Sequence, residues 1–175
     1  MNAALGPYAI AAGLLALAGA MKAWRPADTA TALHGGGVRA PTWVVRAGGF
    51  AEVVVGSLAL VTASAVVAVV VAVSYLAFAV FVAVALVRHL PIASCGCLGK
   101  ADSPPSLVHI GIDAAAALAA LAIAVDPGLA PLDLLHQGVG DSVAYAVLVV
   151  IGIAAAGLAV TLLPRVLALV HQEVR

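Results

Sequence analysis

Residues 43–87 contain only two charged side chains, Arg46 and Glu52, and form a run about twice as long as one membrane-spanning helix needs. A soluble domain has no place for such a run, because roughly a quarter of its residues are charged. The whole chain is 9% charged and 65% hydrophobic, with a mean hydropathy of +1.19. We therefore expect this run to lie in a bilayer and to fold back at residues 62–64.

Five apolar segments of spanning length can be read along the chain. They are residues 4–24, the two halves of 43–87, 105–125 and 142–163. The expected fold class is an all-α integral membrane protein, with a four-helix transmembrane bundle followed by a fifth C-terminal transmembrane helix. The expected divisions are a four-helix domain at 1–125, an external loop at 126–141, and a fifth helix with a cytoplasmic tail at 142–175.

Two local signals mark the ends of the fourth segment. Asp102 and Ser103 stand before Pro104 and Pro105, which predicts a capped helix start with proline in the first turn. At the other end, the Asp-Pro-Gly sequence of residues 126–128 predicts a stop.

The positions of the basic residues predict an orientation. With five spans and the N-terminus outside, every Lys and Arg lies on the cytoplasmic side: Lys22, Arg25, Arg39, Arg46, Arg88, Lys100, Arg165 and Arg175. The loop at 126–141 has three Asp and neither Lys nor Arg. Since cytoplasmic loops are rich in Lys and Arg, we expect a multi-pass protein of a bacterial cytoplasmic membrane with its C-terminus inside. Trp24 and Trp43 are then expected at the inner interface, and Tyr8 and Tyr145 near the outer one.

The chain has two cysteines, Cys95 and Cys97, which flank one glycine after the third segment. A disulfide between them must bend the chain, because bridged Cα atoms lie about 4.4–6.8 Å apart. Such a bridge closes almost no loop and adds little stability, whereas strained, accessible disulfides are typically labile and catalytic. Nearby Arg88 and Lys100 favour the reactive thiolate. The motif therefore indicates thiol–disulfide exchange.

Other interpretations of the cysteine pair stay open. With His89 or His109 the pair could hold a soft metal ion, as in a small metal or solute transporter. However, two thiolates do not complete a four-ligand zinc site, so no bound metal is expected. The pair could also be inert, in a structural subunit of a membrane complex. The formal charge of zero gives no indication of a nucleic-acid partner.

The sequence resembles the MauE/DoxX group over about residues 5–125. The run Cys-Gly-Cys-Leu-Gly at 95–99 is similar to the Cys-x-Cys-Phe-Gly signature of the methylamine utilisation protein MauE, with Leu98 in place of Phe. Further positions resemble those of the group's first two helices: Gly19, Lys22, Pro26, Glu52 and Gly56. The fifth helix lies outside the resemblance.

The resemblance implies a membrane thiol–disulfide oxidoreductase that exchanges electrons through Cys95 and Cys97 with a thioredoxin-like partner. Its role would be disulfide formation or maturation of an exported protein, and it could act as a homo-oligomer or in a larger membrane complex. The expected orientation is in tension with this role, because it places the cysteines on the cytoplasmic side. The chain has no second cysteine pair, so a partner or a quinone must complete the electron path. No other cofactor is expected.

Intramembrane polar residues form a second candidate site. Glu52 and Asp113 are expected at a similar depth, with His109 one turn before Asp113, and an acidic side chain at a helix centre costs about 2.5–3.5 kcal/mol. They could form one pocket that passes protons during dithiol oxidation. Alternatively, Lys22 or Arg46 neutralises Glu52, while His109 and Asp113, one turn apart, hold helices together.

Two further sets of residues bear on the surroundings of this candidate site. Gly48, Gly49 and Gly56 stand three to four residues from Glu52 and predict close helix packing on its face. Aromatic residues of the third segment could line a quinone slot, although such spacing more often reflects lipid or core contacts: Tyr75, Phe78 and Phe81.

Overall fold

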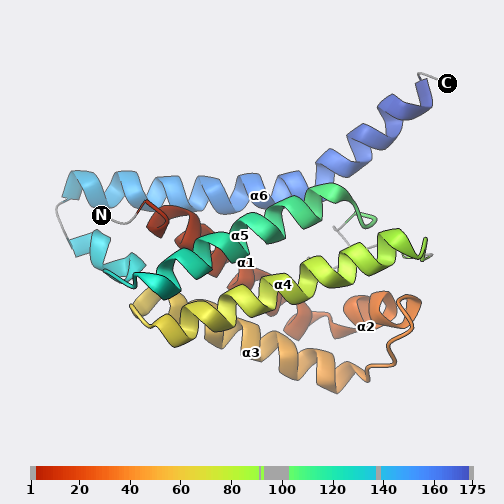
Figure 1. Cartoon of the computed structure of the whole chain (residues 1–175), viewed down its shortest axis with the longest axis horizontal. Helices are drawn as coiled ribbons and strands as arrows, with labels where there is room; N and C mark the ends of the chain where they lie inside the picture. Colours follow the sequence, from red (N-terminus) through yellow and green to blue (C-terminus); the bar gives the residue numbers. More distant parts are fainter. Residues whose placement is uncertain (1–2, 91, 93–102, 137–138, 174–175) are drawn as a thin grey trace.

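The computed structural model describes residues 3–90, 92, 103–136 and 139–173. Its elements are α1 (Leu5–Trp24), α2 (Pro26–Gly35), α3 (Thr42–Val61), α4 (Ala65–Val87), α5 (Leu107–Val125), the 3-10 helix η2 (Pro131–His136) and α6 (Val139–Glu173) (Figure 1). Five of these helices are long and apolar enough to cross a membrane: α1, α3, α4, α5 and α6. The expected all-α membrane fold is confirmed.

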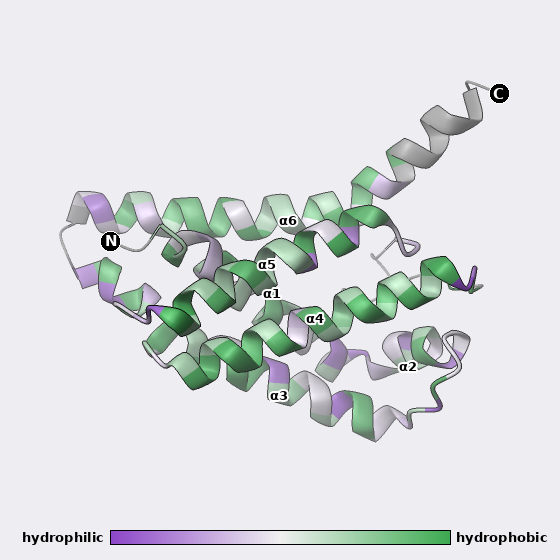
Figure 2. Ribbon diagram, viewed as in Figure 1, coloured by the Kyte–Doolittle hydropathy of each residue, from purple (hydrophilic) through white to green (hydrophobic). Residues whose placement is uncertain are grey.

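The spans lie side by side and give the bundle two distinct ends (Figure 1). The α2 end carries α2, the last turn of α4 and the first turn of α5. The η2 end carries the N-terminus, η2 and the turn between α3 and α4. That turn falls at the expected residues 62–64, and Ser64 caps α4 by accepting a hydrogen bond from the Val67 amide (3.4 Å). Figure 2 shows hydrophobic residues along the spans, with hydrophilic ones concentrated in α2 and the connections.

Glycines bring α1 and α3 into backbone contact along a seam formed by Gly19, Gly49 and Gly56. A Cβ atom at Gly49 would lie 2.7 Å from the carbonyl oxygen of Gly19, and one at Gly56 would lie 2.6 Å from that of Ala12. No side chain fits at such distances, so the seam requires glycine.

The predicted close packing is therefore confirmed for Gly49 and Gly56. It is wrong for Gly48, where a Cβ atom would meet nothing within 4 Å. Gly48 is offset by about 100° around the helix from Gly49, which turns it away from α1.

Helices α4 and α5 form the second extensive pair. Small side chains let them approach closely, and the buried ones are Ala68, Ala72, Ala116, Ala117 and Ala120. The hydroxyl of Tyr75 on α4 donates to the carbonyl oxygen of Ala11 on α1 (2.6 Å), which joins this pair to the α1–α3 pair. The core between the pairs also contains Tyr8, at 1% exposure. The ring of Tyr8 thus packs inside the bundle and does not face lipid, while its expected depth near the outer interface stays a prediction.

The fifth span packs on α1 through two reciprocal contacts. The side chain of Ile153 lies over Gly13, and that of Ile10 lies over Gly152. Only 6% of the most apolar 18-residue stretch of this span is buried inside the protein, so most of α6 exposes an apolar surface. The helix also runs beyond the predicted end at residue 163, through Pro164, and Figure 1 shows it bending toward its C-terminal end. A proline inside a helix removes one hydrogen bond and commonly causes such a bend.

Two features of the α2 end differ from the sequence-based expectation. Helix α2 was not predicted, because ten residues of mixed polarity resemble a loop. Its signals are Pro26 in the first turn and the left-handed Gly37 (φ 84°) just beyond its end. The fourth span begins at Leu107, after Ser106, and not at the Asp102–Ser103 cap. The two prolines hold the chain extended before the helix.

Replacing Gly49 by Ala should lower the free energy of unfolding by about 1–3 kcal/mol, because the added methyl group collides with the α1 backbone. Gly48→Ala is the matched control on the same helix. Its methyl group enters open space, so it should be neutral or slightly stabilising. Denaturant titration of the purified protein in detergent, followed by circular dichroism, measures both. Equal destabilisation by the two changes would contradict the glycine seam.

Candidate polar and thiol site at the α2 end

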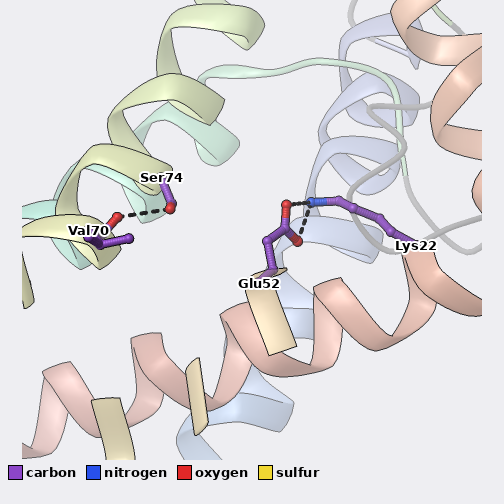
Figure 3. A network of polar contacts seen from close by, with 4 residues as sticks. All are labelled: Lys22, Glu52, Val70 and Ser74. Atoms are coloured by element: carbon purple, nitrogen blue, oxygen red, sulfur yellow. Dashed lines mark hydrogen bonds and ion pairs between the residues drawn. The ribbon is translucent and has the colours of Figure 1, made fainter. Parts of the chain in front are cut away.

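Lys22 and Glu52 form a buried ion pair across the seam. The Nζ atom of Lys22 donates to both carboxylate oxygens of Glu52, each at 2.7 Å (Figure 3). The side chains are 7% and 16% exposed. Lys22 belongs to α1, within the segment expected at residues 4–24, and its side chain is buried in the bundle. Of the two cations proposed to neutralise Glu52, Lys22 does so.

The aromatic ring of Phe78 completes the surroundings of the Lys22 ammonium group, with its centroid 4.4 Å from Nζ. Two of the three N–H groups of Lys22 serve Glu52, which leaves the third without an oxygen acceptor among the described residues. The ring face is attractive to that side of the cation. Ser74, also drawn in Figure 3, bonds within α4 to the carbonyl oxygen of Val70 (2.9 Å) and takes no part in the pair.

Lys22 and Glu52 form part of the lining of a cavity of about 340 Å³. We call it the vestibule; its lining includes Lys22, Glu52, Thr29, Leu33, Phe78 and Phe81. It exists because α1 ends early: Ala23, almost its last residue, lies against Gly49. The first seven residues of α3, about 10 Å of helix, therefore extend past α1. Helix α2 contacts α3, and of these seven residues only Val45 is buried.

His109 and Asp113 line a different cavity, of about 40 Å³, which we call the His109 cavity. Phe78 borders both cavities, so its side chain stands between Glu52 on one side and His109 and Asp113 on the other. The single pocket expected from these three residues is thus two cavities. His109 is 3% exposed, and a hydrogen bond joins its Nδ1 atom to the Ser106 hydroxyl (2.9 Å). The bond expected between His109 and Asp113 stays a prediction.

The chain leaves α4 in a defined turn. Arg88 is the exposed C-cap, and His89 adopts a left-handed conformation (φ 48°). The amide of His89 then donates to Leu86, and that of Leu90 to Ala85, which is a Schellman motif with histidine in the position that glycine usually takes.

The residues on either side of the cysteine segment are both buried against the bundle. Ile92 packs with Ala32 of α2 and Ala85 of α4, next to Phe81. On the far side, the hydroxyl of Ser103 donates to the carbonyl oxygen of Val160 on α6 (2.6 Å).

Ser103 therefore does not cap α5, as the sequence suggested, because its hydroxyl is bound to α6. Val160 also lines the His109 cavity. Cys95, Cys97 and Lys100 lie outside the described residues, in the sequence between Ile92 and Ser103.

The family model described as methylamine utilisation protein MauE matches residues 2–126. The chain belongs to the MauE family. The match covers α1 to α5 and leaves η2 and α6 outside, as the motifs indicated. The relation to DoxX stays a prediction. No curated protein and no solved structure matches the chain.

Sequence reasoning named most of these groups and offered Lys22 as one of two partners for Glu52, but it did not find the other contacts. Over the residues that the structure describes, no three His, Cys, Asp or Glu side chains converge as a metal site would require. Phe78 was noted only as one of three aromatic residues, and its position between the cavities carries no sequence signal. The bond from Ser103 to Val160 joins residues 57 positions apart, which a local pattern cannot reveal.

Changing Glu52 to Gln should lower the free energy of unfolding by about 3–5 kcal/mol, because it leaves Lys22 as an unpaired buried charge. The double change Lys22→Met and Glu52→Leu should recover most of that loss. Arg46→Met, at an exposed position of the same helix, is the control and should have little effect. Denaturant titration of the purified protein measures the set.

A double variant that is no more stable than Glu52→Gln would contradict a structural role for the pair. So would a Glu52→Gln protein that is fully stable but slow in turnover, which would indicate that Glu52 carries protons.

Proposed function

We propose that the protein is a membrane thiol–disulfide redox component that works through Cys95 and Cys97 with a thioredoxin-like partner. The observation that carries the proposal is membership of the MauE family, in a chain whose only two cysteines stand one residue apart. Ile92 and Ser103, on either side of the cysteine segment, are attached to the α2 end. The proposed role is disulfide formation in, or maturation of, an exported protein.

The exchange is a two-electron reaction. A thiolate of the partner attacks one sulfur of the Cys95–Cys97 disulfide, the S–S bond breaks, and a mixed disulfide forms. The partner's second thiolate then releases the chain as a dithiol and leaves the partner oxidised. Two electrons and two protons pass to Cys95 and Cys97, so a second acceptor must remove them before the next cycle.

Proton transfer in this cycle is better suited to the His109 cavity than to Glu52. Both oxygens of Glu52 accept hydrogen bonds from Lys22, so protonating Glu52 would break the ion pair. The His109 cavity, at about 40 Å³, has room for roughly three water molecules, since each needs about 10–15 Å³. We assign Lys22 and Glu52 a positioning role, and His109 and Asp113 the proton exchange.

The distribution of charge supports an orientation with the N-terminus outside in a bacterial cytoplasmic membrane. Arg25, Arg39, Arg46 and Arg88 all belong to the α2 end, while the loop from Asp126 to Asp141 lies at the η2 end. By the positive-inside rule the α2 end faces the cytoplasm. The exchanging partner would then meet the cysteines from that side.

In Cys97→Ser or Cys95→Ser the remaining thiolate can attack the disulfide of the oxidised partner, the reverse of the exchange step, and form the same mixed disulfide. This species should accumulate, because the second cysteine of the chain, which would release the partner as a dithiol, is gone. We expect one of the two variants to accumulate a higher-mass species that disappears on reduction and that contains a thioredoxin-like protein. Non-reducing electrophoresis of membranes from cells treated with acid to quench exchange, followed by mass spectrometry, measures this.

The control is the double variant Cys95→Ser with Cys97→Ser, which should form no such species. Absence of a mixed disulfide from both single variants, together with wild-type thiols that stay reduced in every growth condition, would contradict the proposed function. An unchanged phenotype of both variants would leave the structural-subunit interpretation.

A further inference from the structure

The mouth of the vestibule lies between two membrane spans. Its exposed lining residues are Val44 and Gly48 on α3 and Ala77 on α4. These two helices pack mainly against α1 and α5 and only slightly against each other, which leaves the gap. An opening flanked by two lipid-facing helices admits a ligand that is dissolved in the bilayer.

The interior of the vestibule combines apolar surfaces with the polar side chains of Lys22, Glu52 and Thr29. Phe78 and Phe81 supply aromatic rings, and the Lys22–Glu52 ion pair supplies the charged part of the lining. Among the described residues no oxygen atom accepts from the third N–H of Lys22, whose Nζ atom lies beside the Phe78 ring, so this N–H can donate to an oxygen acceptor. A donor that lines the same cavity as two aromatic rings suits a planar ring that carries a carbonyl oxygen.

We propose that the vestibule binds the head group of a membrane quinone. Its volume of about 340 Å³ falls in the range of about 300–1,000 Å³ typical of small-molecule sites. The ring would pack against Phe78 and Phe81, one carbonyl oxygen would accept a hydrogen bond from Lys22, and the apolar tail would leave between α3 and α4. A lipid acyl chain would also enter, but it has neither a planar face nor an acceptor for Lys22.

A quinone at this place supplies the second acceptor that the cycle requires, and in that respect the inference rests on the proposed function. The dithiol of Cys95 and Cys97 would give two electrons and two protons to the quinone, leaving a disulfide and a quinol. Phe81, which lines the vestibule, also packs with Ile92, three residues before Cys95. The vestibule wall therefore adjoins the segment that leads to the cysteines.

Gly48→Leu tests the site, because its new side chain starts in open space and fills the vestibule. Gly111→Leu on α5 is the matched control: a Cβ atom there also meets nothing, and Gly111 does not line the vestibule. The full chain is placed in nanodiscs of quinone-free phosphatidylcholine and titrated with decylubiquinone. Binding is read from quenching of Trp24 and Trp43, the two tryptophans, both next to the α2 end.

We expect saturable quenching in the wild type and in Gly111→Leu, and binding at least about tenfold weaker in Gly48→Leu. Addition of undecane, which has a chain but no ring, should not displace the quinone. Equal affinity in all three proteins, or displacement by undecane, would overturn the quinone site. No binding in a protein that still forms the mixed disulfide would refute this inference alone. Quinone binding without any mixed disulfide would refute the proposed function alone.

Discussion

The ion pair between Lys22 and Glu52 holds the most demanding part of the bundle in place. Two opposite charges can stay buried inside a membrane protein only when they lie within hydrogen-bond distance of each other. The pair therefore requires α1 and α3 to touch, and the glycines at 19 and 49 make that contact possible by leaving no Cβ atoms between the backbones. The pair and the glycines each need the other, and together they set the register of the two helices.

That register determines the shape of the α2 end. Because α1 stops opposite Gly49, α3 continues alone, α2 folds over it, and the vestibule forms between them. Phe78 separates the vestibule from the His109 cavity, so the Lys22–Glu52 ion pair is divided from His109 and Asp113. The attachments of Ile92 and Ser103 bring the two ends of the cysteine segment to this same part of the molecule.

Much of the fold could be predicted from sequence because lipid imposes a simple rule on length and charge. That rule located the five spans and the turn at 62–64, and the rarity of cysteine singled out residues 95 and 97. It failed at α2, whose ten residues follow no membrane rule. It also could not divide the polar pocket, since the side of α4 on which Phe78 stands depends on contacts with α1 and α5.

A membrane-impermeant maleimide, applied to intact cells and to inverted membrane vesicles with and without prior reduction, tests the central claim most directly. That claim is a redox-active cysteine pair at the cytoplasmic end of the bundle. The account predicts labelling of Cys95 and Cys97 only in inverted vesicles, with a fraction that rises after reduction because part of the protein carries the disulfide. Labelling of intact cells, or complete labelling that does not depend on reduction, would contradict it.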